Sequence, residues 1–267
     1  MSFFHLVLVA IIQGITEFLP VSSSGHLILL PILLEIPDQG QVIDVAAHVG
    51  TLFAVILYFR TDVALAFRGL PAMLMGRLNE PGAKLCFLLA VATVPVVICG
   101  LLLKLSGIDD AMRNITVIGW TMLLFGIVLY FADQKGETAK TQENWSLRDA
   151  IIMGLWQAVA LIPGTSRSGA TITGARFLGY DRQDGAKLAM LMSIPTIIAS
   201  GTLSAIELAA TADASVAADG AVVAVFSFGT ALLALSLMMR LLRSTSFTPY
   251  VIYRVALGCV LLWIAYT

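Results

Sequence analysis

The chain reads Pro20-Val-Ser-Ser-Ser-Gly-His26 near its start and Pro163-Gly-Thr-Ser-Arg-Ser-Gly169 past its middle, and each polar stretch interrupts an apolar region. The apolar arms beside these stretches are too short to span a bilayer, which takes roughly 17–25 mainly apolar residues in a helix. Irregular backbone is tolerated at membrane depth only where protein or a water-filled cavity surrounds it. Residues 3–34 and 150–178 are therefore predicted to form two re-entrant hairpins, each a short helix, a polar apex and a second short helix.

Composition indicates that the rest of the chain also lies in lipid. Of 267 residues, 58% are hydrophobic and 12% are charged, and the mean hydropathy is +0.91. A soluble domain usually carries about a quarter charged residues. Six further segments are long and apolar enough to span a membrane: about 42–59, 85–105, 115–132, 186–209, 220–239 and 249–266. We therefore expect an all-α polytopic membrane protein, with membrane lipid and no nucleic acid among its partners.

Basic loop residues predict the orientation, because Lys and Arg accumulate on the cytoplasmic side of a membrane. The loops predicted to be cytoplasmic are 60–84, 133–149, 179–187 and 240–248. In this arrangement the first hairpin begins and ends outside, whereas the second begins and ends inside. Within the first of these loops, residues 61–77 have periodic apolar positions and could lie along the interface as an amphipathic helix.

The two broken regions resemble each other, since Gln13-x6-Pro20-x4-Gly25 is similar to Gln157-x5-Pro163-x5-Gly169. Their opposite orientation predicts an inverted-topology repeat. Repeat one covers about 1–105 and repeat two about 150–267, with a central span and polar connector at 106–149, all within one membrane domain, 1–267. Inverted repeats with broken helices commonly place their site near the bilayer midplane. We therefore expect the two apices to meet.

Two charged residues, Glu17 and Arg167, are predicted to lie at membrane depth, one at each apex. An ionised side chain there costs about 2.5–3.5 kcal/mol, and such residues are usually functional. The alternative is a purely structural Glu17–Arg167 ion pair that holds the hairpins together, with serines capping the short helices. The other polar candidates are Gln13, Ser22, Ser23, Ser24 and His26 at the first apex, and Thr165, Ser166, Ser168 and Thr171 at the second.

These residue types suit a phosphate ligand. Unpaired amides and the helix dipole at a helix N-terminus attract anions, and Gly25, Gly164 and Gly169 permit close approach of the backbone. Arg167 adds a planar fork of donors suited to phosphate oxygens. Ser23 and His26 lie three residues apart, so a hydroxyl nucleophile with a neighbouring base is available for phosphoryl transfer.

The stretches Glu17-Phe-Leu-Pro-Val-Ser-Ser-Ser-Gly-His26 and Pro163-Gly-Thr-Ser-Arg-Ser-Gly-Ala-Thr171 resemble the two signature motifs of the undecaprenyl-diphosphate phosphatases, the bacitracin-resistance (BacA/UppP) family. The resemblance covers essentially the whole chain. It implies an enzyme of the bacterial cytoplasmic (inner) membrane that hydrolyses undecaprenyl diphosphate to undecaprenyl phosphate and inorganic phosphate. This reaction recycles the lipid carrier for peptidoglycan synthesis. The resemblance also implies a site reached from the extracytoplasmic side and a possible homodimer.

The resemblance assigns roles to residues. The family's Glu/Gln-x3-Glu element falls on Gln13 and Glu17, its serine-rich loop on Ser22 to Ser24, its histidine on His26 and its phosphate-gripping arginine on Arg167. We expect Glu17, Ser23, His26 and Arg167 to be catalytic. We expect Gln13, Ser22, Ser24, Gly25, Gly164, Ser166, Ser168 and Thr171 to bind substrate. Diphosphate chemistry often uses a divalent cation, so Mg²⁺ or Ca²⁺ is expected at Glu17, and the Gln at position 13 departs from a two-carboxylate site.

Several alternatives stay open on the sequence. Ser23 is favoured as nucleophile with Glu17 or His26 as base, but His26 or an activated water could attack instead. An inverted repeat is also typical of secondary transporters or lipid flippases for an anionic substrate. Because transport needs no nucleophile beside its anion donors, the proximity of Ser23 and His26 favours hydrolysis. His48, near the outer start of a span, is expected to make interfacial hydrogen bonds.

Overall fold

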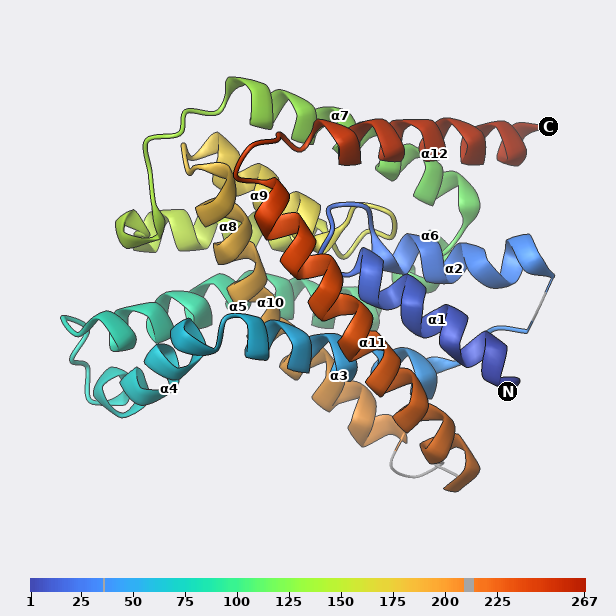
Figure 1. The fold of residues 1–267 in the computed structure, drawn as a ribbon, viewed down its shortest axis with the longest axis horizontal. Helices are drawn as coiled ribbons and strands as arrows, with labels where there is room; N and C mark the ends of the chain where they lie inside the picture. Colours follow the sequence, from blue (N-terminus) through green and yellow to red (C-terminus); the bar gives the residue numbers. More distant parts are fainter. Residues whose placement is uncertain (36, 209–213) are drawn as a thin grey trace.

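The computed structural model describes residues 1–35, 37–208 and 214–267, and nearly all of these residues lie in helices (Figure 1). In chain order the elements are α1 Phe3–Thr16, α2 Ser23–Leu34, α3 Gln41–Tyr58, α4 Arg60–Leu74, α5 Pro81–Ser106, α6 Ile108–Met112, α7 Ile115–Lys135, η1 Gln142–Asn144, α8 Leu147–Val159, α9 Arg167–Phe177, α10 Arg182–Leu208, α11 Ala214–Leu241 and α12 Thr248–Tyr266.

Among the described residues, six helices are long and apolar enough to cross a membrane. They are α3, α5, α7, residues Arg182–Ser204 of α10, residues Val216–Leu241 of α11, and α12. This confirms the predicted all-α polytopic membrane protein. Each predicted span matches one of these helices, although the predicted end of the fourth span, residue 209, lies outside the described residues.

Two of these helices begin four residues earlier than the sequence predicts, α5 at Pro81 and α10 at Arg182. The added turns contain charged residues, which are expensive in the bilayer core but reach the interface from a helix end. Arg182, the first residue of α10, pairs at that helix end with Oδ1 of Asp133, 2.7 Å from its Nε. Proline at the first helical position also suits α5, since the N–H it lacks has no partner there.

The predicted interfacial segment 61–77 contains the helix α4, which packs against α5. The contact is made by glycines, because a Cβ on Gly69 would lie 2.1 Å from the carbonyl carbon of Gly82. On its other side α4 exposes large apolar side chains, with Phe67 76% and Leu74 74% exposed. The segment is therefore helical over Arg60–Leu74, and its amphipathic character and place along the membrane interface stay predictions.

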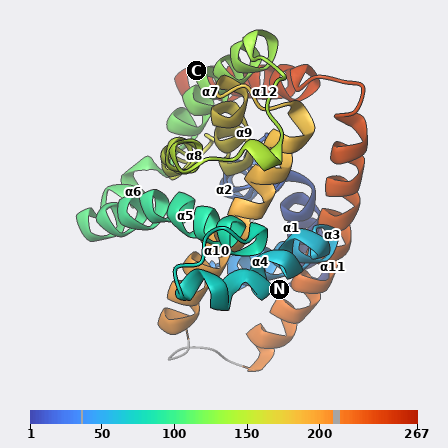
Figure 2. The ribbon, with the colours of Figure 1, turned by 90° about the vertical axis from the view of Figure 1, so that its left-hand side faces the viewer.

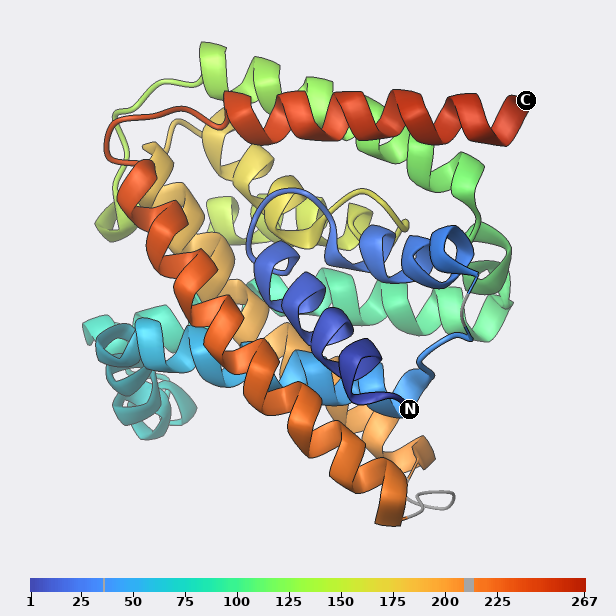
Figure 3. The same cartoon turned by 45° about the vertical axis from the view of Figure 1, so that its right-hand side comes forward.

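Two pairs of short helices form the predicted hairpins, α1 with α2 and α8 with α9. The turns that join them lie near one another in the middle of the molecule, enclosed by the longer helices (Figures 1 and 3). α1 packs against α11 and α3, and α8 packs against α5. Phe18 of the first turn and Ile172 of α9 belong to one buried apolar cluster with Leu235 and Phe247. Packing thus fixes both apices against the spanning helices.

The four loops predicted to share the cytoplasmic side lie together in space. The Asp62 carboxylate accepts hydrogen bonds from Gln142 and pairs with Lys187. The buried Asp133 carboxylate accepts from Arg182 Nε at 2.7 Å and from the backbone N–H of Phe247 at 3.1 Å. α7 and α12 run side by side from this region across one end of the molecule (Figure 2). The contacts agree with a topology in which these loops are on one face.

Candidate active site

The Glu17 carboxylate is the point at which the two apices meet. Glu17 follows the last residue of α1, where its backbone N–H still bonds to the carbonyl of Gln13. Gln13 lies one turn earlier on the same buried face and donates from Nε2 to Oε2 of Glu17 at 2.9 Å. Ser23, the first residue of α2, donates its hydroxyl to the same oxygen at 2.7 Å. The base and the hydroxyl predicted at this apex are therefore in direct contact.

Arg167 closes the site from the second hairpin. It is the first residue of α9, and its guanidinium pairs with Oε1 of Glu17. The carboxylate is buried, whereas the Arg167 side chain keeps 20% exposure. The structure thus contains the ion pair considered above as a purely structural alternative. Because Ser23 and Arg167 share Glu17 as a partner, the guanidinium fork lies near the Ser23 hydroxyl. A phosphate site requires such a donor fork close to the reacting group.

The serines that begin α2 and α9 adopt the same unusual backbone. Ser22 and Ser166 both have φ of 73°, a left-handed conformation that non-glycine residues rarely adopt. Each is an N-cap, because Ser22 Oγ accepts from the N–H of Gly25 at 3.3 Å and Ser166 Oγ accepts from that of Gly169 at 3.1 Å. Such strain clusters at ligand sites. The caps leave the other first-turn N–H groups of both helices directed at the apex.

The remaining hydroxyl residues predicted to bind substrate differ in their exposure and in their hydrogen-bond partners. Ser24 is exposed, whereas Ser168 is buried and donates to the backbone carbonyl of Leu19 at 2.9 Å, tying the two apices together. The Thr171 hydroxyl donates within its own helix, to the carbonyl of Arg167 at 2.9 Å. These two hydroxyls are therefore committed to protein partners, whereas the exposed Ser24 hydroxyl has a long contact of 3.4 Å with Oγ of Ser22.

The predicted glycines are explained mainly by close packing. Gly164 has φ of +85°, and a Cβ there would lie 2.2 Å from Thr121 Oγ1. A Cβ on Gly169 would lie 2.8 Å from Nη1 of Arg254. Gly25 and Gly164 face each other, since a Cβ on Gly25 would be 3.6 Å from Cα of Gly164. The glycines thus allow the two apices and α7 to approach closely.

His26 belongs to the first apex but bonds away from Glu17. Its Nδ1 lies 2.7 Å from the carbonyl oxygen of Ser22, and its Nε2 lies 2.6 Å from the hydroxyl of Tyr253 on α12. The structure therefore joins Ser23 to Glu17, while both ring nitrogens of His26 have other partners.

Sequence reasoning missed two residues at this site. Arg254 of α12 is fully buried and donates to the carbonyls of Pro20, Gly164 and Thr165, so it joins both apices. The sequence did contain a signal for Arg254, because an arginine inside a predicted membrane span is usually functional. His48, expected only at the interface, has Nε2 3.6 Å from Oε2 of Glu17. Its position in α3 relative to Glu17 depends on tertiary packing, which no spacing in the sequence reveals.

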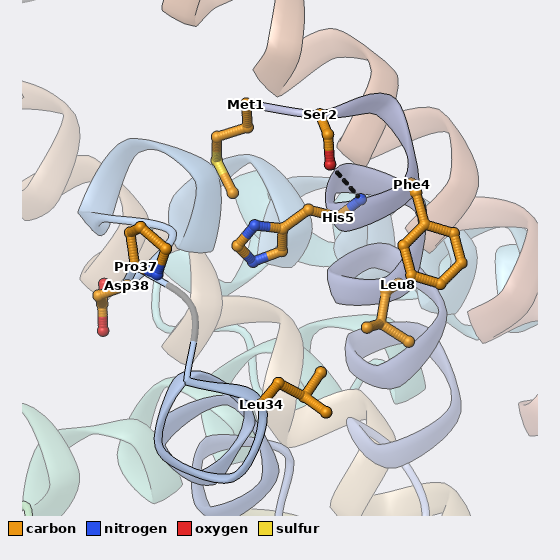
Figure 4. Close-up of a pocket in the computed structure, with 8 residues that line it drawn as sticks. All are labelled: Met1, Ser2, Phe4, His5, Leu8, Leu34, Pro37 and Asp38. Atoms are coloured by element: carbon orange, nitrogen blue, oxygen red, sulfur yellow. Dashed lines mark hydrogen bonds between the residues drawn. The ribbon is translucent and has the colours of Figure 1, made fainter.

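A separate pocket of about 380 Å³ lies between the start of α1 and the end of α2. His5 points into it, between Leu34 on one side and Pro37 with Asp38 on the other (Figure 4). The residues described along its wall include none from either apex. The pocket is therefore distinct from the Glu17 site.

The protein-family model described as bacitracin resistance protein BacA matches residues 6–260. The chain belongs to the BacA family. The matched segment contains both hairpins, so it includes Glu17, Ser23, His26, Arg167 and Arg254. This confirms the resemblance seen in the two motifs.

Several curated relatives of the BacA chain align over their full or nearly full lengths. An undecaprenyl-diphosphatase of Jannaschia sp. (strain CCS1) is 68% identical over 266 residues, with 100% of each chain covered. One from Ruegeria pomeroyi is 68% identical over 267 residues, again with 100% of each chain covered. Undecaprenyl-diphosphatase 1 of Rhodospirillum rubrum is 43% identical over 272 residues, covering 100% of this chain and 96% of the relative.

Proposed function

We propose that this protein is an integral-membrane phosphatase that hydrolyses undecaprenyl diphosphate to undecaprenyl phosphate and inorganic phosphate. The observation that carries the proposal is the Glu17 carboxylate, which accepts the Ser23 hydroxyl and the Arg167 guanidinium together. Relatives 68% identical over the whole chain are named undecaprenyl-diphosphatase. The reaction recycles the lipid carrier for peptidoglycan synthesis and confers bacitracin resistance.

In the proposed mechanism, Oγ of Ser23 attacks the terminal phosphorus and its proton passes to Oε2 of Glu17. The bond from that phosphorus to the bridging oxygen breaks, and undecaprenyl phosphate leaves with the electron pair. Water then cleaves the phosphoserine, and Glu17 returns its proton to Ser23. Ser23 is favoured as the nucleophile because it already contacts the base at 2.7 Å, whereas both nitrogens of His26 are bonded elsewhere.

Arg167 has a direct part in this mechanism. Its partner in the resting site is the Glu17 carboxylate. When Glu17 takes the proton from Ser23 the carboxylate charge is lost, so the guanidinium is released to bind the phosphoryl oxygens as their negative charge develops. Proton transfer and charge stabilisation are thereby coupled through one carboxyl group.

A divalent cation fits the site only if oxygen atoms of the substrate complete its coordination. Across the described residues, no cluster of three or more His, Cys, Asp or Glu side chains is placed to hold a metal. Gln13 Oε1, however, is buried and lacks a hydrogen-bond partner in the described part of the chain. Glu17 and Gln13 would hold Mg²⁺ or Ca²⁺ together with diphosphate oxygens. The ion would neutralise phosphate charge during transfer.

We also propose the inverted repeat, 1–105 against 150–267, and the inner-membrane location with the site open to the extracytoplasmic side. The repeat is supported by equal spacing, since Ser22 is nine positions after Gln13 and Ser166 is nine positions after Gln157. The matched left-handed serine caps and the packing of α1 on α11 and α8 on α5 support it too. The orientation rests on loop charge. A homodimer is proposed on the family resemblance alone.

The alternative of a transporter or flippase receives no support from the relatives, which are named for hydrolysis. Reconstituted liposomes loaded with undecaprenyl diphosphate test the proposal, by scoring phosphate release and lipid sidedness separately. We expect phosphate release by the wild-type protein and none by a Ser23→Ala variant. Movement of intact substrate across the bilayer without phosphate release would overturn it.

A further inference from the structure

His26 and Tyr253 form a contact that links the first hairpin to the last helix. His26 lies in the first turn of α2 and Tyr253 lies in α12. The imidazole and the phenol ring are nearly parallel, with 8° between their planes and 5.7 Å between their centroids. His26 Nε2 lies 2.6 Å from the Tyr253 hydroxyl oxygen. The two residues therefore make both a hydrogen bond and a parallel ring contact.

The partners of His26 define its tautomer. Nδ1 lies 2.7 Å from the backbone carbonyl oxygen of Ser22. A carbonyl oxygen only accepts, so Nδ1 carries the hydrogen and the Nε2 of a neutral ring has the lone pair. The Tyr253 hydroxyl is then the donor to Nε2. In this arrangement the basic nitrogen of His26 is occupied by a phenol and is turned toward α12.

We propose that Tyr253 is a positioning residue of the active site that acts through His26. Its hydroxyl holds the imidazole in the Nδ1-protonated tautomer and determines when Nε2 can take a proton. The proposal rests on the proposed function, in which His26 belongs to the site of phosphoryl transfer. A residue that holds a catalytic histidine in one tautomer contributes strongly to turnover, as the aspartate of serine protease triads does.

The surroundings indicate a role other than packing. Tyr253 is 46% exposed, so its burial contributes little to the stability of α12. Ser24, two residues before His26, is also exposed, whereas Glu17 is buried. The His26–Tyr253 pair thus lies at the exposed edge of the first apex, near Ser24.

Tyr253→Phe isolates the hydroxyl, because phenylalanine retains the stacking on His26. In phosphate-release assays on the full-length protein, we expect kcat to fall about tenfold or more with KM within about twofold of wild type. Tyr250→Phe is the matched control on the same helix, since its ring packs against Phe247. We expect that variant to keep both constants within about twofold. An unchanged kcat in Tyr253→Phe would overturn the proposal.

A double-mutant cycle with His26→Gln tests whether Tyr253 acts through His26. We expect Tyr253→Phe to cause no further loss once His26 is replaced. The same fold-loss in both backgrounds would show that Tyr253 acts independently and would overturn the proposal. Wild-type turnover in His26→Gln would also overturn this proposal but would leave the mechanism of Ser23, Glu17 and Arg167 standing, so the two failures are distinguishable.

Nitrogen-15 NMR of histidine-labelled protein gives a readout that does not depend on activity. The chain has three histidines, and the signal lost in His26→Gln identifies His26. We expect the Nδ1-protonated tautomer with a hydrogen-bonded Nε2 in wild type, and a shifted Nε2 signal or mixed tautomers in Tyr253→Phe. An Nε2-protonated His26 in wild type, or spectra identical in both proteins, would overturn the proposal even if no variant has measurable turnover.

Discussion

Ser23 Oγ lies 2.7 Å from Oε2 of Glu17 and donates its hydrogen bond to it across the turn between α1 and α2. The other carboxylate oxygen accepts the guanidinium of Arg167 from the second hairpin. One buried carboxyl group therefore contacts the candidate nucleophile and the candidate phosphate-binding group. Any change in its protonation alters both contacts, and the first predictions follow from this coupling.

Replacing Glu17 by Gln removes the base but keeps the size of the side chain. We expect kcat for phosphate release to fall roughly 10²–10⁴-fold, the usual contribution of a positioned general base. The control is Glu35→Gln, at an exposed position beyond α2, which should have wild-type rates. A Glu17→Gln rate within about threefold of wild type would show that Ser23 needs no base at this position.

Variants of the Glu17–Arg167 pair can separate its contribution to stability from its contribution to phosphate release. Removing one partner leaves the other charge buried without a counterion, which typically costs about 3–5 kcal/mol. We therefore expect Arg167→Met to lower the thermal unfolding midpoint in detergent. The double variant Glu17→Gln with Arg167→Met should recover most of that midpoint, because neither charge of the pair remains, but should release no phosphate.

Recovery of activity together with stability in this double variant would mean that the ion pair is purely structural. Arg167→Lys provides a finer comparison, since lysine keeps the charge but not the planar fork. We expect this variant to fold with the wild-type midpoint and to release phosphate at least about tenfold more slowly.

Gly164 should not tolerate a side chain. Its φ of +85° is strained for alanine, and the new Cβ would lie 2.2 Å from Thr121 Oγ1. Gly40 has a similar φ of +80° but no atom within 4 Å of such a Cβ. Gly40→Ala therefore reports backbone strain alone, of order 1–3 kcal/mol. We expect Gly164→Ala to lower the unfolding midpoint clearly more than Gly40→Ala, and equal midpoints would contradict the packing described at this apex.

Arg254 is predicted to hold the two apices together. Arg254→Met leaves the carbonyls of Pro20, Gly164 and Thr165 without this donor, and each unsatisfied buried group costs about 1–3 kcal/mol. We expect a lower unfolding midpoint together with loss of phosphate release, and no effect from Arg243→Met at an exposed position. If Arg254→Met unfolds at the wild-type midpoint and is only inactive, Arg254 contacts substrate instead.

The fold could be predicted largely from apolar length and loop charge. A segment of about twenty apolar residues has few options in lipid except a spanning helix, and all six spans were located. The first turns of α5 and α10 were missed because charged residues such as Lys84 and Arg182 lower the apolar content there, although a helix end at the interface accepts them.

The site was predictable where chemistry is local in sequence and less so where it is tertiary. Glu17 and Arg167 were identified by the cost of charge in a membrane, and the same argument applied to span 249–266 would have identified Arg254. The proximity of Ser23 and His26 in sequence suggested that they act as a pair. The structure instead joins Ser23 to Glu17, and His26 to Tyr253, more than two hundred residues away. Pairing of this kind depends on how helices pack, which sequence spacing does not encode.

The central claim, that Ser23 is the nucleophile at a Glu17–Arg167 site, is tested most directly by adjacent serines. Ser23→Ala and Ser24→Ala each remove one hydroxyl oxygen, from neighbouring residues of the same helix turn. Of these two hydroxyls, only that of Ser23 contacts Glu17. With purified protein and undecaprenyl diphosphate, we expect Ser23→Ala to lose at least about a hundredfold in the initial rate of phosphate release. Ser24→Ala, which removes at most one hydrogen bond to substrate, should stay within about tenfold of wild type. Wild-type phosphate release by Ser23→Ala would contradict the account.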